Sequence, residues 1–280
     1  MRKIIHIITA FVFTFSTFTV KAQNDIMSQY WEGVDFNDTT LISSHVMSDK
    51  LVEFFFSFTD GDEQRFDSLS IAGLGFVLDK AKVNMRMYEY ILDFSLNGYS
   101  SMGRDQVTEY LLNYPQLAEG EITVEEGVRL DSITEQYQKV KVGAKAPDYT
   151  GVDIDGKAYR LYDSKAEHII IVFWSTDCEY CHDFLVAIRK NLSLTADFEF
   201  VTFALAENQD EVTKTVKKMR LPGYHFYDDL RWESKAFLDY HITSTPTVFI
   251  LDAEHNIVCK PYDWYELKEW LKLNNLSYRK

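Results

Sequence analysis

Residues 169–182 read IIIVFWSTDCEYCH, an apolar run followed at once by two cysteines with two residues between them. The run, together with His168, is typical of a strand buried in the core of a sheet, and a helical pattern begins at Cys181. Two cysteines at such a junction form a redox-active pair. The letters CEYCH, residues 178–182, also satisfy the C-x-x-C-H signature for covalent haem attachment, so two different functions remain open at this point.

The redox interpretation assigns different tasks to the two cysteines. A thiolate is the reactive species, and the unpaired N–H groups at a helix N-terminus stabilise it, so Cys178 is expected there as the nucleophile. Cys181, one turn later, is expected to be more buried and to attack the mixed disulfide, in an exchange that needs no metal or bound cofactor. Asp177 and Glu179 disfavour a thiolate on Cys178, whereas a protonated His182 favours it. The sequence therefore predicts the pair but not its pKa or reduction potential.

The first 22 residues have the pattern of a cleaved export signal. Arg2 and Lys3 form a positive start, Ile4–Val20 is apolar, and Val20-Lys21-Ala22 places small residues before a cleavage site at Gln23. The apolar stretch is short for a membrane span and is rich in Thr. The mature chain is therefore expected in the periplasm, with no stable insertion in a membrane.

Composition excludes some classes of partner. The chain has 280 residues and a net charge of −14, and loss of the three basic residues of the signal takes the charge to −17. Such a chain repels phosphate backbones, so no nucleic-acid partner is expected. Three cysteines are too few for a disulfide framework, and no His/Cys cluster has the spacing of a structural zinc site, so no metal is expected. Cys259, the third cysteine, is expected to be a structural thiol.

Two domains are expected in the roughly 258 residues after the signal. Residues 23–140 have mainly helical periodicity. The predicted helices there cover Glu63–Leu96 (with Gly73 and Gly75 as candidate breaks and Asn97-Gly98 as a stop), Asp105–Asn113 (ended by Pro115) and, from a capping box at Thr123–Glu126, the residues up to about Lys141.

The pattern changes in residues 141–280, where strands and helices alternate. This order, closed by a hairpin and a helix, predicts a central mixed sheet with helices on both faces. The expected elements are a hairpin over Tyr149–Leu161 that turns at Asp155-Gly156, strands at His168–Trp174, Phe198–Leu205, Thr247–Leu251 and Ile257–Lys260, and helices at Cys181–Leu194, Asp210–Met219, Ser234–Asp239 and Asp263–Leu273.

Two separate motifs in this half resemble a known superfamily. Residues 174–181, WSTDCEYC, resemble the W-x-x-x-C-x-x-C active site of the thioredoxin superfamily, and residues 245–247, Thr-Pro-Thr, resemble its cis-proline loop before a strand. The opening at residues 142–148 and the hairpin turn at residues 155–157 resemble the exported TlpA- and ResA-like branch. The resemblance covers about residues 142–276. The helical part resembles a domain without assigned activity that often precedes such modules in exported bacterial proteins.

The resemblance implies an α/β fold with a thioredoxin-like central mixed sheet, preceded by a mainly α-helical domain. It implies an exported thiol-disulfide oxidoreductase that acts on protein disulfides, as a reductase, and is supplied by a membrane thiol-reducing partner. Cys178 would attack and Cys181 would resolve. The supporting residues would be Trp174 beneath the active-site loop, Glu179 as in the ResA-type C-E-P-C, Tyr180 and His182 around the pair, Pro246 in cis against the disulfide, and Thr245, whose backbone would pair with the substrate chain.

Some positions depart from the pattern of the superfamily. Val172 stands where thioredoxin has a buried acid, and Phe184 stands where ResA-like proteins have a glutamate that assists proton transfer. Asp177 replaces the Trp usually found before the first cysteine, and the intervening pair Glu-Tyr contains no proline. Proton transfer is therefore expected to fall to His182 or to a water molecule.

Three alternatives compete with this function. Covalent haem attachment needs room for a porphyrin and a distal ligand, which a motif directly after a buried strand does not provide. A thiol peroxidase would use the hydroxyl of Ser175, three residues before Cys178, but the proline expected seven residues before that cysteine is Ile171. The third alternative is a non-catalytic protein- or glycan-binding module in which the pair is a structural disulfide.

Overall fold

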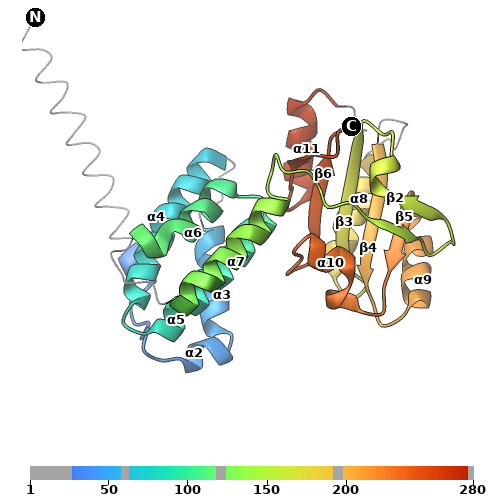
Figure 1. Cartoon of the computed structure of the whole chain (residues 1–280). Coiled ribbons are helices and arrows are strands. Elements are labelled where there is room, and N and C mark those ends of the chain that lie inside the picture. Colours follow the sequence, from blue (N-terminus) through green and yellow to red (C-terminus); the bar gives the residue numbers. More distant parts are fainter. Residues whose placement is uncertain (1–26, 58–62, 118–123, 192–197, 277–280) are drawn as a thin grey trace, which may run out of the picture. The chain divides into compact units, whose positions relative to one another are not determined.

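The computed structural model describes residues 27–57, 63–117, 124–191 and 198–276 (Figure 1). Contacts between residues divide the chain into two compact units: Met1–Leu96 with Glu109–Gly120, and Asn97–Thr108 with Glu121–Lys280. The predicted domain limits, 23–140 and 141–280, stay predictions. The predicted export signal and its cleavage site lie outside the described residues. Within the described ranges, no helix combines the length and apolar composition needed to cross a membrane.

The first unit is helical, as predicted. Its core is made by apolar side chains at helical spacing, among them Leu74, Val77, Leu78 and Ile91, which are fully buried. The helices of this part of the chain are α2 (Thr40–Ser43), α3 (Val46–Phe56), α4 (Glu63–Ala81), α5 (Met85–Ser101) and α6 (Asp105–Leu117).

Three predicted helix boundaries in this part are wrong. The chain breaks between α4 and α5 and not at Gly73 or Gly75, because Asn84 caps α5: its side-chain oxygen accepts hydrogen bonds from the backbone N–H groups of Arg86 (3.1 Å) and Met87 (3.4 Å). Gly75 lies inside α4 at a close approach, since a Cβ there would lie 2.7 Å from the Tyr110 hydroxyl oxygen.

The other two corrections concern helix ends. Helix α5 continues through the predicted stop at Asn97-Gly98 to Ser101, and α6 continues through Pro115 to Leu117. Pro115 lies in the last turn of α6, where a proline interrupts only the final hydrogen bonds of a helix. Helix α7 (Val124–Val140) agrees with the prediction, although its predicted capping residue Thr123 lies outside the described residues.

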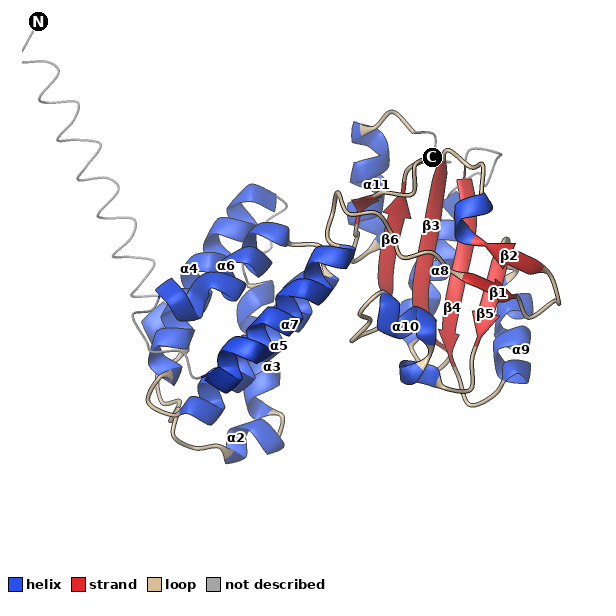
Figure 2. Cartoon of the chain, viewed as in Figure 1, coloured by secondary structure: helices blue, strands red, loops and turns tan. Residues whose placement is uncertain are grey.

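The second unit is built on a five-stranded mixed sheet in the order β5-β4-β3-β6-β7 (Figure 2). Strands β3, β4 and β5 are parallel to one another, whereas β6 is antiparallel to both of its neighbours, β3 and β7. A separate antiparallel hairpin, β1 with β2, matches the one predicted around Asp155-Gly156. The strands are β1 (Thr150–Val152), β2 (Ala158–Arg160), β3 (His168–Ser175), β4 (Phe198–Leu205), β5 (Tyr224–Tyr227), β6 (Thr247–Leu251) and β7 (Ile257–Cys259).

Strand β3 is buried on both faces, and its side chains alternate between two hydrophobic cores. Ile170, Val172 and Trp174 pack in the core that contains residues of α8, α9 and α11. Ile169, Ile171 and Phe173 pack in the other core, which contains residues of α10 and of the β1–β2 hairpin. The helices of this half are α8 (Glu179–Asn191), α9 (Gln209–Met219), α10 (Lys235–Asp239) and α11 (Trp264–Leu273).

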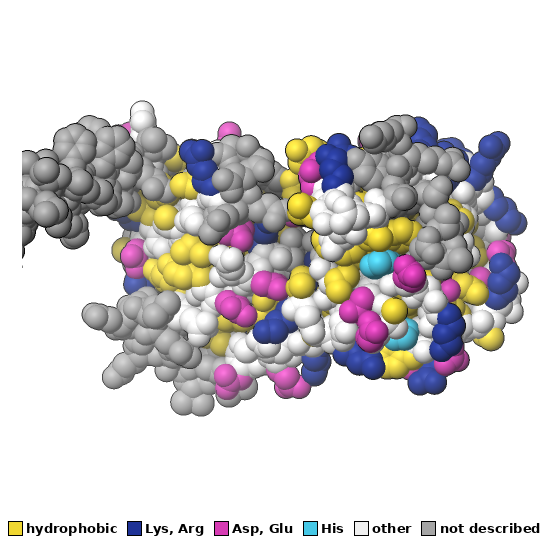
Figure 3. All heavy atoms as spheres, turned by 90° about the horizontal axis from the view of Figure 1, so that it is seen from above, with side chains coloured by type: hydrophobic (Ala, Val, Ile, Leu, Met, Phe, Trp, Pro, Cys, Tyr) yellow, Lys and Arg dark blue, Asp and Glu magenta, His cyan; other side chains and the backbone are white. Residues whose placement is uncertain are grey.

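The predicted strands and helices of this half are present. Helix α8 begins at Glu179, two residues before the predicted start at Cys181, and its predicted end at Leu194 lies outside the described residues. The four-residue strand β5 and two short 3-10 turns, at Leu161–Asp163 and Arg231–Glu233, were not predicted. Figure 3 shows one face, on which acidic and basic side chains are interspersed with apolar ones.

Gly223 allows β5 to join the sheet. It directly precedes β5 and has a φ of +94°, and a Cβ on it would lie 2.0 Å from the carbonyl oxygen of Phe200 in β4. Both the positive φ and the close approach require the absence of a side chain. The sheet edge at β5 therefore depends on this glycine.

We expect Gly223→Ala to lower the free energy of unfolding by roughly 2–5 kcal/mol, because strain at positive φ adds to a clash with the backbone of β4. Gly156→Ala is the control: Gly156 has a φ of +82° but nothing within 4 Å of its virtual Cβ, so only about 1–2 kcal/mol should be lost. Urea unfolding followed by tryptophan fluorescence measures both. Equal losses in the two variants would show that the contact with Phe200 has no energetic weight.

Candidate active site

The two cysteines lie where β3 ends and α8 begins. The backbone N–H of Thr176 donates to the carbonyl of Leu205 at the end of β4 (3.0 Å), which ties the connecting loop to the sheet. The N–H of His182 donates to the carbonyl of Cys178 (3.1 Å), the first i to i−4 bond of α8. Cys178 is therefore the N-cap residue of the helix, the position that sequence analysis predicted.

Cys178 and Cys181 form a disulfide, with their Cα atoms 5.2 Å apart. The backbone N–H of Cys181 points at the sulfur of Cys178, with a nitrogen–sulfur distance of 3.0 Å. The side chain of Cys181 is 0 % exposed, whereas that of Cys178 is only partly buried. The two sulfurs are thus unequal in access to solvent and in hydrogen bonding.

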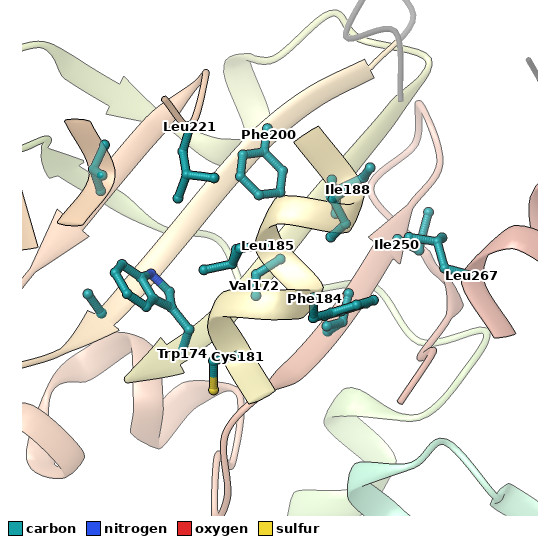
Figure 4. Packing of buried hydrophobic residues seen from close by; sticks show 14 of the residues in the cluster. Val172, Trp174, Cys181, Phe184, Leu185, Ile188, Phe200, Leu221, Ile250 and Leu267 are labelled. Carbon is teal, nitrogen blue, oxygen red and sulfur yellow. The ribbon is translucent and has the colours of Figure 1, made fainter. Parts of the chain in front are cut away.

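Helix α8 is held against the core by the buried side chains on one of its faces, Cys181, Phe184, Leu185 and Ile188. Figure 4 shows Trp174 of β3 beside the start of α8 and near Cys181, and both residues belong with Leu185 to one buried hydrophobic cluster. Trp174 is fully buried, and its ring lies edge-on to that of His182, with ring centroids 6.0 Å apart. The role of Trp174 beneath the active-site loop stays a prediction.

The Thr245-Pro246 peptide bond is cis, as the sequence predicted, and the register of the sheet brings it beside the cysteines. Thr247 of β6 pairs with Phe173 of β3, so residues 245 and 246 lie level with the end of β3. The carbonyl oxygen of Thr245 is 3.9 Å from the sulfur of Cys178. Two segments 67 residues apart in sequence therefore meet at one sulfur atom.

Glu179 and Tyr180, the two residues between the cysteines, are exposed. Tyr180 is 52 % exposed, and its hydroxyl donates to the carbonyl of Tyr262 (3.5 Å). Partial burial, followed by the charge of Asp263, raises the pKa of Tyr180 to about 12, so the hydroxyl stays a donor at neutral pH. The contact with Tyr262 was not predicted, and no local pattern in the sequence indicates it.

The structure accounts for the departures from the superfamily pattern. Val172 and Phe184 are both buried members of the core that contains Cys181, so no carboxylate lies at either position. Asp177 and Glu179 are exposed on either side of Cys178. His182 is the nearest residue after the pair with a titratable ring, and its Nε2 atom is buried without a hydrogen-bond partner among the described residues.

In a comparison with known protein families, residues 142–260 match a family model described as the AhpC/TSA family. The thioredoxin-like protein YneN of Bacillus subtilis is 27 % identical over 128 residues, which cover 43 % of this chain and 74 % of that protein. The thiol-disulfide oxidoreductase ResA of Bacillus cereus is 24 % identical over 125 residues, 44 % of this chain and 70 % of ResA.

A solved structure extends the likeness in fold to most of the chain. A thioredoxin-like protein from Bacteroides caccae superimposes with a TM-score of 0.57 at 18 % identity, covering 90 % of this chain and 93 % of that one. At this identity the comparison concerns the fold, which is thioredoxin-like with preceding helices, as the sequence predicted.

We expect iodoacetamide to modify Cys178 first in the folded, reduced protein. Cys181 should react at least about tenfold more slowly, because alkylation requires an accessible thiolate and Cys181 has no exposed surface. Peptide mapping by mass spectrometry over a time course measures both rates, with the half-buried Cys259 as an internal reference. Faster labelling of Cys181 than of Cys178 would contradict the assignment of Cys178 as the accessible thiol.

Proposed function

We propose that this protein is an exported thiol-disulfide oxidoreductase that reduces disulfides in protein substrates. The proposal starts from the match of residues 142–260 to the AhpC/TSA family model and from the similarity of this part of the chain to YneN and ResA. The observation that carries the proposal is the inequality of the two sulfurs. Cys178 is accessible at a helix N-cap and accepts an N–H bond, whereas Cys181 is fully buried one turn further on. This arrangement suits an attacking cysteine followed by a resolving one.

The exchange proceeds in two displacements. The Cys178 thiolate attacks one sulfur of the substrate disulfide, a bond forms between these sulfurs, and the other substrate sulfur leaves as a thiolate that takes up a proton. Cys181 then loses its proton and attacks the sulfur of Cys178, which releases the second substrate thiolate. The substrate gains two electrons and two protons, and the protein is left with the Cys178–Cys181 disulfide.

The surrounding groups have separate roles in this proposal. The N–H of Cys181, 3.0 Å from the sulfur of Cys178, stabilises the attacking thiolate. The backbone at Thr245 and Pro246 lies beside the same sulfur and offers a place where an extended substrate chain can pair. Trp174 holds the loop from below, and Tyr180 and Glu179 form its exposed rim. With Val172 and Phe184 apolar, the proton of Cys181 passes to His182 or to water.

Turnover needs a donor of electrons, because the disulfide formed in one cycle must be reduced before the next. We propose a membrane thiol-reducing partner for this step and the periplasm as the compartment. Both parts rest on the export pattern of residues 1–22 and on the resemblance to exported relatives. The relatives named ResA are described as thiol-disulfide oxidoreductases, in line with the proposed reaction.

Reduction of insulin by dithiothreitol tests the proposal. The wild-type chain should accelerate precipitation of the insulin B chain, and Cys178→Ser should lose that acceleration because the sulfur that forms the mixed disulfide with insulin is absent. Cys181→Ser should accumulate a mixed disulfide that migrates as a larger species on a non-reducing gel.

Cys259→Ser is the matched control and should retain the wild-type rate, because Cys259 lies on β7 and outside the pair. Equal rates for wild type and Cys178→Ser would make the pair a structural disulfide. A Soret band in the purified protein would instead support haem attachment, and rapid consumption of peroxide by Cys178 alone would support a peroxidase.

A further inference from the structure

Beside the active site, α8 and α9 form a groove of about 510 Å³. Helix α8 contributes His182, Val186 and Arg189, which are spaced i, i+4 and i+7 and so share one face. This face is offset by one residue from the core-facing stripe of Cys181, Leu185 and Ile188 seen in Figure 4. Helix α9 contributes Thr215, Lys218 and Met219, and Arg220 follows at its C-cap.

The charges that line the groove are all positive. Arg189, Lys218 and Arg220 line it without any carboxylate, although the chain as a whole has a net charge of −14. None of these three cations forms an ion pair with an acidic side chain among the described residues. The groove is therefore a local basic site on an acidic protein.

Two of the residues that line the groove each have a buried nitrogen without a hydrogen-bond partner among the described residues. These nitrogens are Nε2 of His182, at the end near the disulfide, and Nε of Arg189, at the other end. A buried polar atom without a partner costs about 1–3 kcal/mol. Helix dipoles account for cations in the last turns of α8 and α9, but they account equally for Lys190 and Lys217, which do not line the groove. Lys190 and Lys217, by contrast, have no buried nitrogen of this kind.

The groove begins at the active site and leads away from it. His182 directly follows Cys181, and its ring packs against Trp174. Arg189 is seven residues further along α8, which corresponds to about 10 Å at 1.5 Å per residue. An extended chain at about 3.3 Å per residue spans that distance in about three residues.

The rim of the disulfide has the opposite charge. Asp177 and Glu179 are exposed on either side of Cys178, so they repel acidic residues adjacent to a target cysteine. Together, rim and groove discriminate by position: carboxylates are disfavoured next to the target cysteine and favoured about three to five residues away.

We propose that this groove binds acidic side chains of the disulfide-containing protein substrate, and so selects substrates whose carboxylates lie a short distance from the target cysteine. The proposal rests on the proposed function, since the occupant is the segment of a substrate bonded to Cys178. Carboxylates fit the groove because they pair with guanidinium and ammonium groups and accept hydrogen bonds from nitrogens.

Peptide probes test the proposal on the reduced full-length protein. Each probe has one cysteine as a mixed disulfide with thionitrobenzoate, and carries either two Glu or two Gln residues on each side, four and five positions from the cysteine. Release of thionitrobenzoate gives the second-order rate constant. At about 20 mM salt the Glu probe should react roughly tenfold faster than the Gln probe, and the ratio should approach one at about 0.5 M salt.

Two double variants with the same change in net charge separate the groove from the general field of the protein. Arg189→Glu with Lys218→Glu should abolish or invert the preference for the Glu probe. Lys190 and Lys217 are the sequence neighbours of Arg189 and Lys218, but they are exposed and do not line the groove. The variant Lys190→Glu with Lys217→Glu should therefore retain most of the preference for the Glu probe. Arg189→Gln with Lys218→Gln repeats the test with less disturbance to folding.

Equal rate constants for the two probes with wild-type protein, or equal loss of preference in both double variants, would overturn the groove proposal. Failure of the proposed function looks different: the Gln probe would then react no faster with wild type than with Cys178→Ser.

Discussion

The double-sided burial of β3 is the constraint on which the rest of the site depends. Val172, Phe173 and Trp174 are completely buried and are hydrogen-bonded in register with β4 on one side, with Val172 and Phe173 also paired to β6 on the other. The strand therefore cannot shift by a residue without moving apolar side chains between the two cores. Because the end of β3 is fixed, the residues that follow it begin at a defined position at the edge of the sheet.

The start of α8, which follows β3 directly, gives the two cysteines different environments. Cys181, Leu185 and Ile188 face the core and hold the helix, while Cys178 remains at the N-cap, where the helix presents an N–H to its sulfur. The same register brings Thr245 to within 3.9 Å of that sulfur. One packing requirement thus determines which sulfur is accessible, which is shielded and where a substrate backbone can lie.

The charges around the pair follow a second pattern, one set by helix faces. Asp177 and Glu179 surround the accessible sulfur, whereas the positive side chains lie on the groove face of α8 and across from it on α9. The acidic rim opposes a thiolate that the helix N-terminus favours. The chain thus separates the group that reacts from the groups proposed to select what it reacts with.

Much of this site could be predicted from the sequence, since a strand buried on both faces and a cysteine pair before a helix have strong local patterns. β3, β4 and β6 lie where the sequence pattern placed them, α8 begins two residues earlier than predicted, and the Thr-Pro motif identified the cis bond. Features set by tertiary contact were missed. Strand β5 depends on the fit of Gly223 against Phe200, Gly75 stays helical against Tyr110, and the groove exists only because two helices distant in sequence are adjacent in space.

The central claim is that Cys178 attacks and Cys181 resolves, and stopped-flow reaction with Ellman's reagent tests it directly. Reduced Cys181→Ser should release its first thionitrobenzoate at a rate within a few-fold of wild type and retain the mixed disulfide, whereas wild type should release a second equivalent as the pair closes. Reduced Cys178→Ser should react roughly a hundredfold more slowly than wild type. The signal of Cys259, measured in a variant that lacks both cysteines of the pair, is subtracted first. A Cys178→Ser rate equal to that of Cys181→Ser would contradict the inequality of the two sulfurs on which the account is built.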